Sequence, residues 1–162
     1  MQTTDLVARP CYIHAVISPS AVPFTESPDL GRIEELFTAW IEALTAGNSA
    51  RVARLHVPHG VFQHPGGKGA RGREAIQRAC SGWLSGGTLP SLVLFETRLF
   101  EPADVATANG RFTIAPGDWG TCAEHARGRL LLVAEKSDER WGLRFSGLFS
   151  DAFLRELDQL VI

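Results

Sequence analysis

Apolar residues recur at helical spacing over the stretch from Leu30 to Gly47. They fall at i, i+3, i+4, i+7, i+8 and i+11, which is one stripe of an amphipathic helix: Ile33, Leu36, Phe37, Trp40, Ile41 and Leu44. Ser27 and Pro28 are expected to cap and open this helix, and Gly47 is expected to end it. The pattern therefore predicts a long helix with one face in the core.

Two shorter helices and a strand are predicted next. Asn48 or Ser49 is expected to cap a short helix. Residues 57–63 have strand character, and the glycine-rich run 65–69 is expected to be a loop because it suits neither helix nor strand. Helical spacing returns over residues 72–84, where two glycines end the pattern.

From Pro90 onward the pattern becomes that of strands. Four are expected, over residues 92–100, 105–115, 121–135 and 141–150. Helices followed by a run of antiparallel strands predict an α+β domain, in which the helices pack on one face of a sheet. We expect an extended arm over residues 1–28, the domain over 29–155 and a short tail over 156–162.

Alternation along the last two strands assigns their faces. In the final strand one face is apolar and is expected to point inward: Trp141, Leu143, Phe145, Gly147 and Phe149. In the strand before it we place the even-numbered residues inward, which brings Glu124 to the inside. A shift by one residue would bring His125 there instead.

Composition narrows the function classes. A chain of 162 residues suits one domain, and a net charge of −2 without a dense Lys/Arg run disfavours nucleic acid and anionic membranes as partners. We find no apolar run near the ~20 residues that a spanning helix needs. Three cysteines without a CxxC pair indicate a reducing, cytoplasmic setting.

Histidines are the main candidates for chemistry. His64 ends the first strand, and an imidazole with a reference pKa of about 6.5 accepts protons near neutral pH. The alternative is a strand-end histidine that hydrogen-bonds the glycine-rich loop. The spacing of His56, His59 and His64 matches no metal-ligand pattern, so no metal site is expected. Cys80 lies on the apolar stripe of the third helix and is expected in the core.

Several motifs resemble the nuclear transport factor 2-like superfamily, and within it the SnoaL-like polyketide cyclases and ketosteroid isomerase. They are Phe-Gln-His-Pro at 62–65, Gly-Arg-Glu-Ala-Ile at 72–76, Gly-Arg-Phe-Thr at 110–113 and Trp-Gly-Leu at 141–143. The resemblance covers about residues 30–150. It implies a cone-shaped fold, in which three N-terminal helices pack on a curved, mostly antiparallel sheet that encloses a pocket. Such folds include both enzymes and binding proteins.

The resemblance also suggests roles for single residues. His64 falls where ketosteroid isomerase has its general-base aspartate, and Trp40 falls where that enzyme has an oxyanion-hole tyrosine. An indole donates one hydrogen bond but cannot give up its proton. The second acid of that oxyanion hole would fall near Leu130 or Leu131, and no acid is present there.

We therefore expect binding of a small hydrophobic molecule, such as a polyketide, terpenoid or steroid-like compound, and cofactor-independent isomerisation, cyclisation or dehydration. His64 would act as general base, with Trp40 and Glu124 orienting the substrate or stabilising charge. Aromatic residues would line the pocket: Phe37, Phe62, Trp83, Phe112, Phe145 and Phe149. A homodimer through the sheet face is expected. The alternative is a non-catalytic ligand-binding or dimeric interaction module of the same fold.

Overall fold

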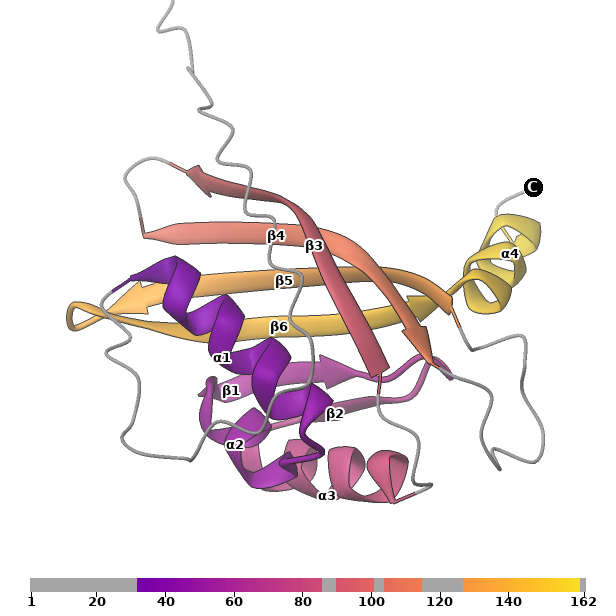
Figure 1. Ribbon diagram of the computed structural model, residues 1–162, viewed down its shortest axis with the longest axis horizontal. Coiled ribbons are helices and arrows are strands. Elements are labelled where there is room, and N and C mark those ends of the chain that lie inside the picture. Colours follow the sequence, from indigo (N-terminus) through magenta and orange to yellow (C-terminus); the bar gives the residue numbers. More distant parts are fainter. Residues whose placement is uncertain (1–31, 86–89, 101–103, 115–126, 161–162) are drawn as a thin grey trace, which may run out of the picture.

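The computed structural model describes residues 32–85, 90–100, 104–114 and 127–160. Helices cover one face of a curved, open sheet (Figure 1), as the α+β prediction required. The elements are α1 (Ile33–Thr45), α2 (Ser49–Arg54), β1 (His56–Gln63), β2 (Gly69–Arg71), α3 (Arg73–Leu84), β3 (Pro90–Phe100), β4 (Val105–Ile114), β5 (Arg127–Ser137), β6 (Arg140–Ser150) and α4 (Asp151–Leu160). None of the described helices is long and apolar enough to cross a bilayer.

The six strands form one sheet in the order β2-β1-β6-β5-β4-β3. Among the described strands only the β1–β6 pair is parallel, and the other pairs are antiparallel. The parallel pair has a consequence for the site. Because β1 and β6 run the same way, the C-terminal end of β1 lies beside the C-terminal end of β6, where α4 begins.

Helix α1 carries the predicted apolar stripe but starts later than predicted. Its N-cap is Arg32, which has an extended backbone and no capping side-chain bond, so Ser27 is not the cap. Gly47 follows the helix with φ +68°, as expected for a helix-ending glycine. Trp40 and Phe37 of this stripe are fully buried.

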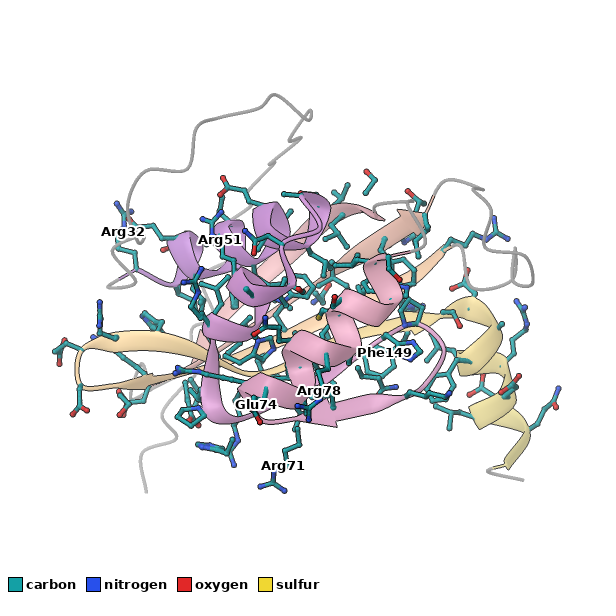
Figure 2. The ribbon with its side chains drawn as sticks, turned by 90° about the horizontal axis from the view of Figure 1, so that it is seen from below. Arg32, Arg51, Arg71, Glu74, Arg78 and Phe149 are labelled. Carbon is teal, nitrogen blue, oxygen red and sulfur yellow. The ribbon has the colours of Figure 1, made fainter. Side chains whose placement is uncertain are left out.

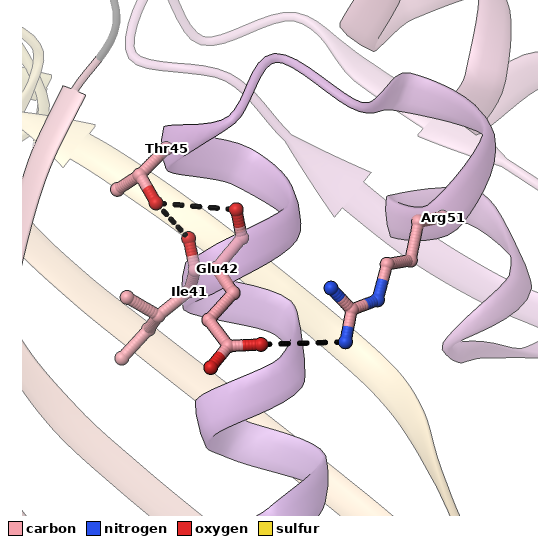
Figure 3. Close-up of polar contacts among 4 residues, drawn as sticks. All are labelled: Ile41, Glu42, Thr45 and Arg51. Carbon is pink, nitrogen blue, oxygen red and sulfur yellow. Dashed lines mark hydrogen bonds and ion pairs between the residues drawn. The ribbon is translucent and has the colours of Figure 1, made fainter. Parts of the chain in front are cut away.

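Helix α2 is short and is tied to α1 by polar contacts. The Asn48 side chain accepts a 2.9 Å hydrogen bond from the Arg51 amide, which confirms the predicted cap. Arg51 Nη2 lies 3.3 Å from Glu42 Oε2, and Thr45 Oγ1 donates to the Ile41 carbonyl at 2.8 Å (Figure 3). Of these contacts, the Glu42–Arg51 ion pair joins the two helices, and buried residues of both helices belong to one apolar core.

The alternation predicted for β6 fails halfway along the strand. Val133 of β5 pairs with Phe145, but the next residue, Ala134, pairs with Leu143, so Arg144 is an extra residue in the ladder. Such a β-bulge reverses which face later side chains occupy. Trp141 and Leu143 point inward as predicted.

Beyond the bulge the prediction is therefore wrong for Phe145, Gly147 and Phe149. Phe145 and Phe149 lie on the outer face, opposite to the face that α1 and α3 cover, while Ser146 and Leu148 are buried on the inner face. In β5 the even-numbered residues Gly128, Leu130 and Leu132 are buried, as predicted.

Two further features shape the ends of the sheet. Asp138 and Glu139 both have positive φ, so a two-residue turn joins β5 to β6. At the other end, residues 151–160 form a full helix, α4, which projects from the end of the sheet (Figure 1). The Ser150 hydroxyl accepts a 3.1 Å hydrogen bond from the Phe153 amide and so caps the first turn of this helix.

Candidate functional site

Trp40 of α1 belongs to the buried core of the domain. Its side chain has no exposed surface, and it shares one buried cluster with Phe37, Phe62 and Phe112. Its Nε1–H has no hydrogen-bond partner among the described residues. Leaving a buried donor unpaired costs about 1–3 kcal/mol, so this indole nitrogen is an unusual feature of an otherwise apolar interior.

Four of the six predicted pocket-lining residues belong to the same buried cluster as Trp40. Phe37, Phe62 and Phe112 are fully buried, and Trp83 is nearly so. The rings of Phe62 and Trp83 pack with their centroids 6.2 Å apart. These side chains fill the interior.

The remaining two predicted residues, Phe145 and Phe149, lie on the opposite face. Their ring centroids are 6.2 Å apart, and Phe149 lies 6.4 Å from Phe153 of α4. Figure 2 shows Phe149 beside α4. The bulge at Arg144 prevents either ring from lining a pocket against Trp40.

His64 follows the last residue of β1 and is half-buried. Its Nδ1 accepts a 3.0 Å hydrogen bond from the Gly66 amide, and its carbonyl accepts one from the Gly67 amide at 3.0 Å. A neutral imidazole whose Nδ1 accepts carries its proton on Nε2. In this conformation His64 therefore presents an N–H group from Nε2, and its Nδ1 lone pair is occupied.

The third predicted catalytic residue, Glu124, lies outside the described residues, as does its alternative, His125. Among the described residues, no group of three or more His, Cys, Asp or Glu side chains could hold a metal ion. Cys80 is buried as predicted, and burial raises the pKa of its thiol to about 12, so it stays protonated.

The structure reveals one polar pair that the sequence reasoning missed. His56 and Ser146 are both buried, and Ser146 Oγ lies 2.8 Å from His56 Nε2. His56 Nδ1 lies 2.8 Å from the Val52 carbonyl, which can only accept, so Nδ1 donates and Nε2 accepts from Ser146. Both imidazole nitrogens are satisfied. Regular alternation had placed Ser146 outside, so the sequence offered no signal for this pair.

Burial also determines the charge of His56. The pKa of this imidazole is lowered from 6.5 to about 4, mainly by desolvation and to a smaller extent by the nearby Arg73 guanidinium, against the opposing effect of the hydrogen bond with the Val52 carbonyl. Arg73 Nε also donates to the His56 carbonyl at 2.7 Å. The ring is therefore neutral near pH 7, and it acts as a structural link between β1 and β6.

An open hollow of about 250 Å³ lies on the side of α1 near Arg51. It is lined by Glu34, Glu35, Thr38, Ala39, Glu42 and Arg51. The ion pair between Glu42 and Arg51 occupies part of this lining. The hollow is acidic and does not include Trp40 or His64, so it is separate from the candidate site.

Comparison with known proteins gives both a family match and similar folds. The family model described as a SnoaL-like domain matches residues 33–146. No curated protein matches the chain.

Several solved structures share the fold. A domain with a cystatin-like fold from Nostoc punctiforme has a TM-score of 0.63 at 18% identity, over 85% of this chain and 86% of that one. A protein with a cystatin-like fold from Caulobacter vibrioides has a TM-score of 0.61 at 20% identity, over 80% and 94%. A nuclear transport factor 2-like protein from Novosphingobium aromaticivorans has a TM-score of 0.59 at 17% identity, over 83% and 89%. At these identities the likeness establishes the fold alone.

Proposed function

Because this chain belongs to the SnoaL-like domain family, we propose that it binds a small, largely apolar molecule between α1 and the inner face of the sheet. The bound molecule carries one hydrogen-bond-accepting oxygen, and Trp40 Nε1–H donates to that oxygen. A carbonyl or hydroxyl oxygen on a polyketide, terpenoid or steroid-like skeleton has this chemistry.

The observation that supports this proposal is the unpaired Nε1 of Trp40. His56 and Ser146, which are also buried on this face, are hydrogen-bonded to one another, so neither needs a ligand to complete its hydrogen bonds. An acceptor oxygen would recover the hydrogen bond that Trp40 lacks, and the surrounding aromatic rings would contact an apolar skeleton. Since Trp40 has no exposed surface, the ligand enters only when neighbouring side chains move apart.

The catalytic part of the proposal assigns proton transfer to His64. With Nδ1 bound to the Gly66 amide, the neutral ring donates from Nε2, and it becomes a base at Nδ1 only when that contact opens. The reaction class is cofactor-independent proton transfer next to a carbonyl, as in isomerisation, cyclisation or dehydration. Glu124 remains a predicted orienting acid.

Binding is tested with a matched pair of probes, 1-tetralone and tetralin, which differ by one carbonyl oxygen. The protein has four tryptophans, so its ¹H–¹⁵N spectrum contains four indole signals, and Trp40→Phe identifies one of them. We expect 1-tetralone to shift the Trp40 signal downfield and tetralin to leave it in place. We also expect Trp40→Phe to remove the preference for 1-tetralone, which is about tenfold for one hydrogen bond. Equal binding of the two probes would refute the proposal.

Proton transfer is tested with the same ketone in D₂O. A base that removes an α-proton of 1-tetralone forms the enolate, which takes deuterium from solvent, and ¹H NMR follows the loss of the α-signal. We expect His64→Ala to slow this exchange at least tenfold while the affinity for 1-tetralone stays within twofold. Exchange at the wild-type rate in His64→Ala would leave ligand binding as the function.

A specific observation favours a second candidate, self-association through the outer face of the sheet. Apolar side chains are exposed there: Leu131 is 37% exposed and Val105 is 42% exposed, beside the half-buried Val133. Exposed Arg129 lies on the same face as Leu131, and an apolar surface with arginine at its edge is typical of protein interfaces.

The partner that we propose for this face is a second copy of the chain. Helix α4, at the end of the same sheet, exposes Glu156 and Asp158, which are complementary in charge to Arg129 in a twofold arrangement. Sedimentation should show a dimer that Leu131→Glu dissociates and Arg78→Glu on α3 does not, because the Arg78 side chain is 73% exposed on a different element. A wild-type monomer at all concentrations would refute self-association.

A further inference from the structure

The turn that holds His64 is closed by three hydrogen bonds. The His64 amide donates to the Lys68 carbonyl at 3.2 Å, and the Gly67 amide donates to the His64 carbonyl at 3.0 Å. The Gly66 amide donates to His64 Nδ1 at 3.0 Å. The orientation of the imidazole is therefore set by the shape of the turn, because one of these three bonds is made by the ring itself.

The Phe153 side chain of α4 contacts this turn. The ring of Phe153 lies against Gly67, where a β-carbon would come within 2.8 Å of Cε2 and 3.0 Å of Cδ2. Gly67 also has φ +78°, a conformation that other residues rarely adopt. Glycine thus serves two purposes at this position. It adopts the backbone conformation of the turn, and its lack of a side chain lets the Phe153 ring pack against the backbone.

Phe153 is the last ring of a stack that begins on β6. Phe145, Phe149 and Phe153 follow one another at 6.2 and 6.4 Å, with interplanar angles of 20° and 24°. Gly147 makes room for the first two rings, because a β-carbon there would lie within 2.7 Å of both. The stack connects the outer face of the sheet to the His64 turn.

The rest of α4 makes little contact with the domain. Ala152 is buried and Phe153 and Leu154 are half-buried, whereas residues 155–159 are exposed. The first turn is held by the Ser150 cap and by the ion pair between Arg127 and Asp151 at 3.5 Å. The docking of α4 therefore depends mainly on the side chains of this first turn.

From these contacts we infer that Phe153 is a positioning residue that holds the His64 turn closed, so that α4 controls the availability of His64 Nδ1. When Phe153 leaves Gly67, the turn can open and the Gly66 amide can release Nδ1. This inference rests on the proposed role of His64 in proton transfer, but its structural part does not require a ligand.

Phe153→Ala tests the inference, with Leu157→Ala as the matched control, because Leu157 lies one turn further along α4 and is 41% exposed. Without ligand, we expect amide exchange at Gly66 and Gly67 to become about tenfold faster in Phe153→Ala and to stay unchanged in the control. Phe153→Tyr, which keeps the ring, should restore slow exchange. Phe149→Ala, which removes the middle ring, should show a smaller effect in the same direction.

With 1-tetralone in D₂O, we expect Phe153→Ala to raise the rate constant for α-proton exchange at least threefold while the affinity stays within twofold. Unchanged exchange at Gly66 and Gly67 in both alanine variants would overturn the inference. Because the amide measurement needs no ligand, it can succeed when 1-tetralone does not bind, and that result would count against the proposed function alone.

Discussion

His56 and Ser146 are 90 positions apart in the chain, yet they share a 2.8 Å hydrogen bond in the core. The bond joins the start of β1 to the middle of β6, next to the parallel pairing of these strands. Both side chains are buried, and Ser146 supplies the hydrogen-bond donor that His56 Nε2 needs. The pair therefore links β1 to β6 by a side-chain hydrogen bond within the core.

The pH dependence of stability should follow from the state of His56. Its folded pKa of about 4 lies below the ordinary 6.5, so the unfolded chain binds more protons between these values. The contribution of neutral His56 to the free energy of unfolding is fully present above pH 6.5. About 3 kcal/mol of it is lost as the pH falls from 6.5 through 4. Urea unfolding at pH 7.0, 5.5 and 4.0 should show this loss, and His56→Gln should lack this component. Parallel pH profiles for the two proteins would contradict the prediction.

Ser146→Ala should destabilise the fold by about 1–3 kcal/mol. The change removes the donor to His56 Nε2 and leaves a buried acceptor without a partner. Ser137→Ala is a suitable control, because Ser137 is exposed at the end of β5. Urea unfolding at pH 7 would measure both changes, and a cost below 0.5 kcal/mol for Ser146→Ala would show that the hydrogen bond adds little.

The bulge at Arg144 predicts unequal costs for two neighbouring truncations. Leu143 is fully buried, so Leu143→Ala should cost about 2–5 kcal/mol. Phe145 is half-buried on the outer face, so Phe145→Ala should cost about 1–2 kcal/mol, below the usual value for a buried phenylalanine. Equal costs would indicate regular alternation without a bulge. Guanidinium unfolding of both variants would decide between these outcomes.

The bulge also shows where sequence reasoning stops. The helical stripe of α1, the Asn48 cap and the even-numbered inner face of β5 follow from local periodicity, and the structure confirms them. An extra residue in one strand leaves no mark in an alternating pattern until the partner strand is known. The sequence therefore predicted the burial of Trp40 but misplaced Phe149.

Replacing glycine with alanine should change the stability of the protein in opposite directions at Gly128 and Gly82. At Gly128 in β5 a β-carbon would overlap the Phe149 carbonyl oxygen, so Gly128→Ala must push apart two paired backbones and should cost about 3 kcal/mol or more. At Gly82 in α3 nothing lies within 4 Å of the same atom, and the position is exposed. Gly82→Ala should therefore stabilise the protein by about 0.5–1 kcal/mol, because alanine loses less backbone entropy in a helix. Thermal unfolding of the two variants measures both effects, and a stable Gly128→Ala protein would mean that β5 and β6 approach less closely than described.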